Sequence, residues 1–248
     1  WQNLARRYPP PFSWIERWVL RHSDYALFGT REAEAVWRGK GYTGPGAVIP
    51  QFGVDPAIYS PAPARPDRPL TIGYAGRFVP EKGLELLLHA ALKLPGKWRI
   101  RLAGDGPERD MLKTVAGVLN IGGQVHFDGP IASTDMPAFY RELDVFVLPS
   151  LTRPNWKEQF GRVLVEAMAS GVAVIGSDSG AIPEVIGEAG LIFPEGDAEA
   201  LALCLRSVAR EDVRRQLIER GRARVLERYT QAQVAAQTVA VYHEMLGW

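Results

Sequence analysis

The chain has 248 residues, of which 46% are hydrophobic and 23% charged, and its formal net charge is +1. This composition is typical of a globular protein, and the near-neutral charge argues against a nucleic-acid partner. The single cysteine, Cys204, excludes an internal disulfide bond, and no apolar run is long enough to cross a bilayer. The four histidines are scattered and no Asp-x-Asp pair occurs, so we predict no metal site.

The first 46 residues are predicted to form only a few elements. Ser13 and Glu16 have the spacing of a capping box, which predicts a helix from Ser13 to about His22. The elements expected after it are a strand over 25–28 and a helix over 32–39. These elements would bury too little apolar surface for an independent core. We therefore expect residues 1–46 to be the end of a further domain that lies outside this sequence.

From residue 70 onward, short apolar runs alternate with segments of helical periodicity. After a short strand at 48–49, the predicted strands cover 70–75, 98–103, 125–127, 145–148, 173–175 and 191–193. The predicted helices cover 83–93, 108–119, 135–141, 161–169, 198–209, 212–227 and 231–246. This alternation predicts an α/β fold with a Rossmann-like parallel sheet and helices on both faces. We expect this domain to span 47–230.

In such a sheet, ligands bind beyond the carboxyl ends of the strands, where loops lead into helices. The segment Gly76–Gly83 follows a predicted strand at this edge and contains Arg77 and Lys82. Two cations beside the free N–H groups of a helix start suit a diphosphate. The alternative is that both are solvated surface charges.

Two glutamates accompany the helix predicted over 161–169, Glu158 before it and Glu166 inside it. Glu166 lies among apolar residues, and a buried carboxylate needs a partner. Arg162, four residues earlier on the same face, would make an ordinary ion pair, whereas vicinal hydroxyls of a ligand would make a functional contact. Glu158 precedes the helix, where it either contacts a ligand or is a favourable charge at a helix start. The residues alone leave both alternatives open.

Glycine-containing turns follow two more predicted strands, at 104–107 and 177–184. Glycine permits tight turns and a close approach of the backbone to a ligand. Ordinary connections between strands and helices explain such glycines equally well.

In combination, these segments resemble the C-terminal domain of family-four retaining glycosyltransferases of the GT-B fold. The similarity begins at about Pro50 and continues to the end of the chain. The matching motifs are Gly-Arg-x-x-x-x-Lys-Gly at 76–83, Val-His-Phe-Asp-Gly at 125–129, Asp-Val-Phe-Val-Leu-Pro-Ser at 144–150, Glu-x-Phe-Gly-x-x-x-x-Glu at 158–166 and Gly-Ala-Ile-Pro-Glu at 180–184. Two positions depart from the family pattern, because Gln51 replaces the usual Asn and Ala181 replaces a frequent Gly.

The resemblance implies a role for each of these residues in binding a nucleotide-diphosphate sugar, which would be the donor substrate, with no further cofactor. Arg77 and Lys82 would bind its diphosphate, and Glu166 its ribose hydroxyls. Glu158 would contact the sugar and face the reacting centre. The remaining contacts would come from the backbone of Phe160, Gly161 and Arg162 around sugar and phosphate, and from the main chain of Ile131 to the base.

The resemblance also implies the reaction and the missing parts. A hexosyl group would pass from a UDP- or GDP-sugar to an acceptor hydroxyl with retention of anomeric configuration. The acceptor would be a glycan, a lipid-linked molecule or a small molecule. The segment 231–248, which contains the last helix, would cross back to an N-terminal acceptor domain. Without that domain, this chain would be inactive. A nucleotide-binding module, a sugar-nucleotide epimerase and a phosphorylase are the rival functions.

The first predicted helix contains Trp14, Trp18, Arg17 and Arg21. Such a helix could lie on a membrane surface, as an alternative to burial against that further domain. The expected location is the cytoplasm, either free or peripheral to the inner face of the membrane.

Overall fold

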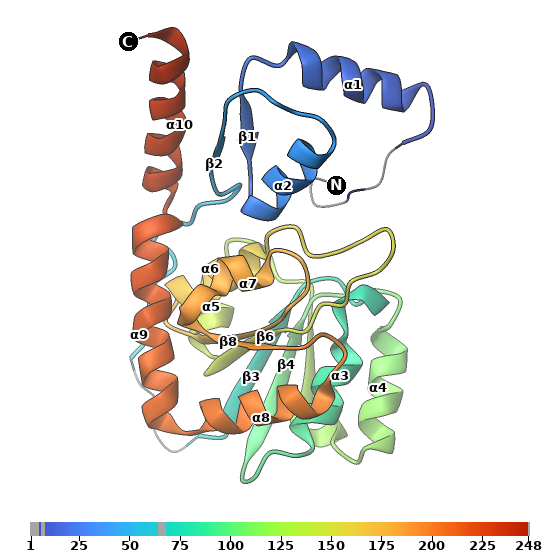
Figure 1. The fold of residues 1–248 in the computed structure, drawn as a ribbon. Coiled ribbons are helices and arrows are strands. Elements are labelled where there is room, and N and C mark those ends of the chain that lie inside the picture. The colour runs from blue at the N-terminus through green and yellow to red at the C-terminus, as the bar shows by residue number, and fades with distance from the viewer. Residues whose placement is uncertain (1–4, 6–7, 64–67, 248) are drawn as a thin grey trace.

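The computed structural model describes residues 5, 8–63 and 68–247. Its main unit is a six-stranded parallel sheet covered by helices, with a small two-stranded unit above it (Figure 1). The strands of the large sheet are β3 (Leu70–Ala75), β4 (Trp98–Ala103), β5 (Val125–Gly129), β6 (Val145–Leu148), β7 (Ala173–Ser177) and β8 (Leu191–Phe193). The α/β, Rossmann-like parallel fold predicted from the sequence is therefore confirmed.

The strand order in the large sheet is β5-β4-β3-β6-β7-β8. Strands β3, β4 and β5 follow one another toward one side of the sheet, and β6, β7 and β8 follow one another toward the other side. The order therefore reverses between β3 and β6, and their neighbouring carboxyl ends form the topological switch point at which such sheets bind ligands. All six strands are parallel, so the loops that follow them share one edge of the sheet.

Two sets of helices cover the sheet. One consists of α3 (Leu84–Ala91), α4 (Arg109–Val118) and α8 (Ala198–Ala209), and the other of α5 (Met136–Arg141), α6 (Arg162–Ala169), α7 (Ile182–Ile186) and α9 (Glu211–Arg228). Their apolar faces and the central strands form a single continuous core around residues such as Ile72, Leu88 and Val174, all fully buried. Cys204 on α8 is half-buried against this core, and burial raises the pKa of its thiol.

The small unit consists of α1 (Phe12–His22), β1 (Ala26–Phe28), α2 (Arg31–Gly39) and β2 (Gly46–Val48). Its strands pair in parallel, and among its described residues the buried cluster consists of Phe28, Ala33 and Tyr42. Such a small core depends on neighbouring surfaces for stability. The unit contacts the large one through the backbone N–H of Arg31, which donates to both carboxylate oxygens of Glu184 at 3.0 Å.

The last helix, α10 (Gln231–Leu246), continues from α9 and runs beside the small unit (Figure 1). The Tyr25 hydroxyl on the small unit donates to Glu244 Oε2 at 3.2 Å. Among the helices of the described residues, none is long and apolar enough to cross a membrane.

Three details of the sequence prediction were wrong. The short strand expected at 48–49 is β2 at Gly46–Val48. The first helix begins at Phe12 after Pro11, and Ser13 lies inside it, so Ser13 and Glu16 form no capping box and no side chain caps this helix. Glu16 instead forms an ion pair with Lys40 at 2.6 Å. The five-residue helix α7 was missed, because Ser177–Glu184 was interpreted only as a turn.

Candidate functional site

The loops after β3 and β4 touch through their backbones at the carboxyl edge of the sheet. Gly104 has φ +129°, and a Cβ atom there would lie 1.9 Å from the carbonyl oxygen of Gly76. The Phe78 N–H donates to the carbonyl of Asp105 at 2.8 Å, which ties the two loops together. The Gly106 N–H donates to the Asp105 carboxylate, and this bond lowers the pKa of that carboxyl. Glycine at 104 is therefore required by packing and not only by turn geometry.

The loops after β3 and β6 also touch, on either side of the switch point. Gly83 has φ +62°, and a Cβ atom there would lie 2.2 Å from the carbonyl oxygen of Pro149. The Leu151 N–H donates to the carbonyl of Glu81 at 2.8 Å. These contacts hold the end of the Gly76–Gly83 segment against the loop that leads to Glu158.

This arrangement brings Lys82 and Glu158 together. The Lys82 Nζ lies 2.5 Å from Glu158 Oε2, and the Ser150 hydroxyl donates to the same oxygen at 3.1 Å. The side chains of Lys82 and Glu158 are 18% and 12% exposed, so the pair is largely desolvated. The Lys82 ammonium also lies 4.8 Å from the ring centroid of Trp156, in a cation–π contact.

Arg77 is placed differently from Lys82. It is exposed, and among the described residues its guanidinium forms no ion pair or hydrogen bond. Its backbone is nevertheless fixed, because the Tyr74 hydroxyl donates to the Arg77 carbonyl at 2.9 Å. Burial raises the pKa of Tyr74 well above its ordinary value, so this phenol stays a hydrogen-bond donor at physiological pH.

Glu166 is 3% exposed and both of its carboxylate oxygens have partners. Arg162 Nε donates to Oε1 at 2.7 Å, and the Tyr140 hydroxyl donates to Oε2 at 2.8 Å. The ion pair expected from the i, i+4 spacing is therefore present. Burial, followed by the charge of Glu166, raises the pKa of Tyr140.

Glu166 and Arg162 line one side of a cavity of about 390 Å³. The opposite wall comes from the segment 51–59, which includes Phe52 and Tyr59, and from Gln231 at the start of α10. A ligand could reach the Glu166 carboxylate from this cavity.

Phe160 and Gly161 form the turn that precedes α6. Phe160 is buried between Phe52 and Tyr229, with ring centroids 5.7 and 5.9 Å away. Gly161 has φ +78° and precedes the first residue of the helix. The Ala181 N–H donates to the Glu158 carbonyl at 3.0 Å, and a Cβ atom on Gly180 would lie 2.1 Å from that oxygen. The loop after β7 thus fixes the backbone at Glu158.

Ile131 lies in the loop after β5 and is half-buried against the core. The Gly129 carbonyl, two residues earlier, accepts from the Gly104 N–H at 2.7 Å. The structure therefore places the predicted residues in two groups, one around the Lys82–Glu158 pair at the carboxyl edge and one around Glu166 in the second turn of α6.

Sequence analysis missed three residues of this site, namely Tyr140, Ser150 and Trp156. Ser150 ends the Asp-Val-Phe-Val-Leu-Pro-Ser motif, and that position after a strand was the only available signal. Tyr140 and Trp156 had none, because their contacts depend on how distant segments pack. Within the described ranges, His, Cys, Asp and Glu side chains nowhere gather in a group of three or more that could hold a metal ion.

Comparison with known protein families identifies the family to which this chain belongs. The model of the family described as "Glycosyl transferases group 1" matches residues 57–224, which is more than half of the chain and includes the loops described above. The chain belongs to this family. Its six-stranded sheet and switch-point loops are thus the group 1 glycosyl transferase framework.

Individual relatives agree with this assignment. The chain is 35% identical over 214 residues to a phosphatidyl-myo-inositol mannosyltransferase of Mycolicibacterium smegmatis, a match covering 82% of this chain and 53% of the relative. A solved sucrose-phosphate synthase from Thermosynechococcus elongatus superposes with a TM-score of 0.80 at 28% identity, covering 94% of this chain and 61% of that one. The chain thus spans about half the length of the curated relatives it matches.

A third comparison shows the fold alone. The Anabaena protein HepE, solved in complex with UDP, superposes with a TM-score of 0.82 at 21% identity, covering 92% of this chain and 66% of that one. The solved structures to which this chain is similar therefore place it in the GT-B fold.

Proposed function

We propose that this chain binds the nucleotide-diphosphate sugar donor of a retaining, family-four glycosyltransferase at the carboxyl edge of its six-stranded sheet. The observation that carries the proposal is the meeting of Lys82 and Glu158, from the loops after β3 and β6, at the topological switch point. In sheets with this strand order, the switch point is where nucleotides bind.

The Lys82 ammonium has three N–H donors, and Glu158 Oε2 occupies one of them. It can therefore keep its carboxylate partner while it donates to a phosphate oxygen. Arg77 is exposed and would add a bidentate contact to the same diphosphate. Two cations there would stabilise the negative charge that develops on the leaving diphosphate, without calling on a metal ion.

Glu158 would position the donor sugar. Its Oε2 accepts from Lys82 and Ser150, which holds the carboxylate in one orientation beside the phosphate cations. We assign it no role as a nucleophile. Phe160, Gly161 and Arg162 would present backbone groups to sugar and phosphate, since they open α6 beside Glu158.

Glu166 would bind the ribose hydroxyls from the cavity that it shares with Arg162. Tyr140 would keep one oxygen, whereas the hydroxyls would share or replace the contact from Arg162, whose side chain is 49% exposed. Ile131 would meet the base through its main chain in the loop after β5.

The reaction we propose is transfer of a hexosyl group to the hydroxyl of a glycan, a lipid-linked molecule or a small molecule. The acceptor would be bound by a further domain, to which residues 1–46 and the helix within 231–248 would belong or attach. The exposed apolar residues of α1, such as Trp14 and Trp18, would face that domain or a membrane surface. Residues 47–230 would form the donor domain.

Calorimetric titration of UDP and of GDP into the chain tests the donor site. One nucleotide should bind, and Glu166→Gln should weaken it about tenfold or more, because a carboxylate accepts stronger hydrogen bonds than an amide. Glu199→Gln on the exposed side of α8 is the matched control and should bind as the wild type does. Equal affinities in wild type and Glu166→Gln would contradict the ribose assignment.

Product analysis on the enzyme with its acceptor domain tests the reaction. A glycoside with the anomeric configuration of the donor supports retaining transfer. An epimerised donor, a sugar phosphate or the absence of any product would instead indicate an epimerase, a phosphorylase or a binding module.

A further inference from the structure

The start of α2, in the small unit, is capped by a residue of the large unit. The Arg31 N–H opens this helix, and such an N–H has no acceptor within its own helix. The Thr30 hydroxyl accepts from the Ala33 N–H instead, at 3.1 Å. Both carboxylate oxygens of Glu184 accept from the Arg31 N–H at 3.0 Å. Glu184 therefore supplies the missing acceptor, and its negative charge is favourable at a helix N-terminus.

An ion pair joins the same turn of α2 to the loop between β6 and α6. It is formed by Glu32 in the small unit and Lys157 in that loop. The side chains are 33% and 19% exposed, so the pair is partly shielded from water and from screening by salt. The start of α2 is thus bound to the large unit at two neighbouring points.

Both of these contacts lead to the backbone of Glu158. Lys157 is its neighbour in the chain, and Glu184 closes the segment whose Ala181 N–H donates to the Glu158 carbonyl at 3.0 Å. A Cβ atom on Gly180 would lie 2.1 Å from the same carbonyl oxygen, so this segment has no room to move closer. The Glu158 backbone is therefore linked to α2 through its preceding residue and through its own carbonyl.

The Glu158 carboxylate has contacts that depend on this backbone. Its Oε2 accepts from Lys82 and from Ser150. Hydrogen bonds weaken steeply when their angles depart from the preferred geometry, and a displacement of about 1 Å at a site can cost much of its effect. A contact that fixes the backbone at Glu158 therefore also fixes where its carboxylate points.

We propose that Glu32, Lys157 and Glu184 are positioning residues, which hold Glu158 in the orientation that contacts the donor sugar. They make the small unit part of the donor site although none of them touches the donor. This inference deepens the proposed function and rests on it for the sugar contact. Loss of the contacts should therefore weaken binding of the sugar part of the donor and leave binding of its nucleotide part unchanged.

Amide hydrogen exchange, measured by NMR on the chain without ligand, tests the positioning by itself. The Ala181 amide should exchange about fivefold faster in Glu32→Gln and in Glu184→Ala, because its segment has lost a contact that holds it. The Leu151 amide, which donates to the Glu81 carbonyl near the start of the same loop, should exchange as in the wild type. Unchanged exchange of Ala181 in both variants would overturn the proposal.

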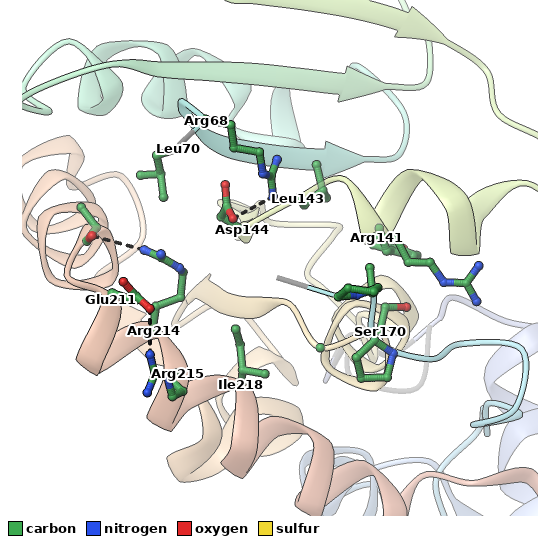
Figure 2. A pocket seen from close by; sticks show the side chains of 16 residues that line it. Arg68, Leu70, Arg141, Leu143, Asp144, Ser170, Glu211, Arg214, Arg215 and Ile218 are labelled. Carbon is green, nitrogen blue, oxygen red and sulfur yellow. Dashed lines mark hydrogen bonds and ion pairs between the residues drawn. The ribbon is translucent and has the colours of Figure 1, made fainter. Parts of the chain in front are cut away.

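A matched control is the ion pair between Arg68 and Asp144. Both of its side chains are 19% exposed, and it lies at the amino edge of the sheet, in the wall of a cavity of about 560 Å³ (Figure 2). Asp144→Asn should lower the free energy of unfolding without faster exchange at Ala181. Equally fast exchange in this control would show a general loosening of the fold and would overturn the positioning role.

Calorimetric titration tests the consequence for the donor, with UDP beside UDP-glucose and GDP beside GDP-mannose. Glu32→Gln should weaken binding of the sugar nucleotide about fivefold and leave binding of the free nucleotide unchanged. The double variant Glu32→Lys with Lys157→Glu restores an ion pair of opposite sense and should recover most of this loss.

The outcomes of the titration separate the two proposals. Equal losses for nucleotide and sugar nucleotide, or an unchanged affinity for the sugar nucleotide, would overturn the positioning role while the donor site stands. A wild type that binds neither nucleotide would overturn the donor site and with it the sugar contact, whereas faster Ala181 exchange would still support the link to α2.

Discussion

At the carboxyl edge of the six-stranded sheet, three loop glycines lie against the backbone of another loop, whereas two glycines in turns of the amino edge face open space. Cβ atoms added at Gly83, Gly104 and Gly180 would each come within 2.2 Å of a backbone carbonyl of another loop. Added at Gly96 or Gly122, in turns of the amino edge, they would meet nothing within 4 Å. Backbone contact between loops therefore requires glycine at these three carboxyl-edge positions. At the amino edge Gly171 also has a close neighbour, but that neighbour is the side chain of Pro61, at 2.8 Å.

Each edge also contains an ion pair between distant segments. Lys82 and Glu158 at the carboxyl edge are 76 residues apart and largely buried, and so are Arg68 and Asp144 at the amino edge. The two edges therefore differ in the backbone contacts of their loops and not in the presence of such pairs.

Substitution of Gly104 should have the largest effect. Gly104→Ala is expected to lower the free energy of unfolding by about 3 kcal/mol or more, because the new methyl group overlaps the Gly76 carbonyl and φ is positive. Gly96→Ala, also at positive φ but in open space, should cost only about 1 kcal/mol. Urea unfolding measures both, and equal losses would show that the packing of the two edges does not differ.

Replacement of one lysine at each edge tests the same comparison through the affinity for the nucleotide. Lys82→Ala should weaken nucleotide binding about 30-fold, or about 2 kcal/mol, through loss of a charge-assisted contact. Lys93, just beyond the other end of α3, pairs with Glu199 at the amino edge, and Lys93→Ala should leave the affinity unchanged. The account is wrong about this edge if calorimetry finds the larger loss in Lys93→Ala.

A smaller effect is expected from Tyr140→Phe. The phenol donates to the buried Glu166 carboxylate, so its removal should lower the free energy of unfolding by about 1.5 kcal/mol. Nucleotide binding should weaken as well, because Glu166 loses the contact that orients it. The exposed Tyr242 on α10 gives the control Tyr242→Phe. Denaturant unfolding should detect no change in the control, and a loss of equal size there would contradict the role of Tyr140.

The smallest effect concerns two carboxyl groups beside the Gly104 turn, whose pKa values shift in opposite directions. Burial, helped by Glu85 and Glu81, raises the pKa of Glu108, so its ionised form weakens the fold as pH rises through the raised value. The Gly106 N–H lowers the pKa of Asp105, whose contribution is present above its ordinary pKa and is lost on acidification.

Unfolding measured between pH 3 and 7 should therefore separate the two groups. Glu108→Gln should gain stability relative to the wild type as pH rises, and Asp105→Asn should lose it. Parallel pH profiles for the two variants would show that these shifts do not contribute.

The sheet could be predicted because buried parallel strands appear as short apolar runs, so that 70–75, 98–103 and 145–148 were correct to the residue. Helical spacing offered the Arg162–Glu166 pair as one of two alternatives for Glu166, and the pair is present. The first helix was placed wrongly at its start because Ser13 has the spacing of a cap, while the chain enters the helix from Pro11.

The Lys82–Glu158 and Tyr140–Glu166 contacts could not be predicted. Each joins segments whose approach depends on strand order and on the packing of loops, and neither quantity is encoded in local spacing. The same holds for the amino-edge cavity, whose lining comes from distant segments of the chain.

Backbone amide NMR shifts recorded while the binding nucleotide, UDP or GDP, is added test the central claim most directly. The account predicts perturbations in 76–84, 129–132 and 158–166 at the carboxyl edge, with 94–97, 120–124 and 170–172 at the amino edge unchanged. Perturbations confined to the amino edge would contradict the donor-site assignment.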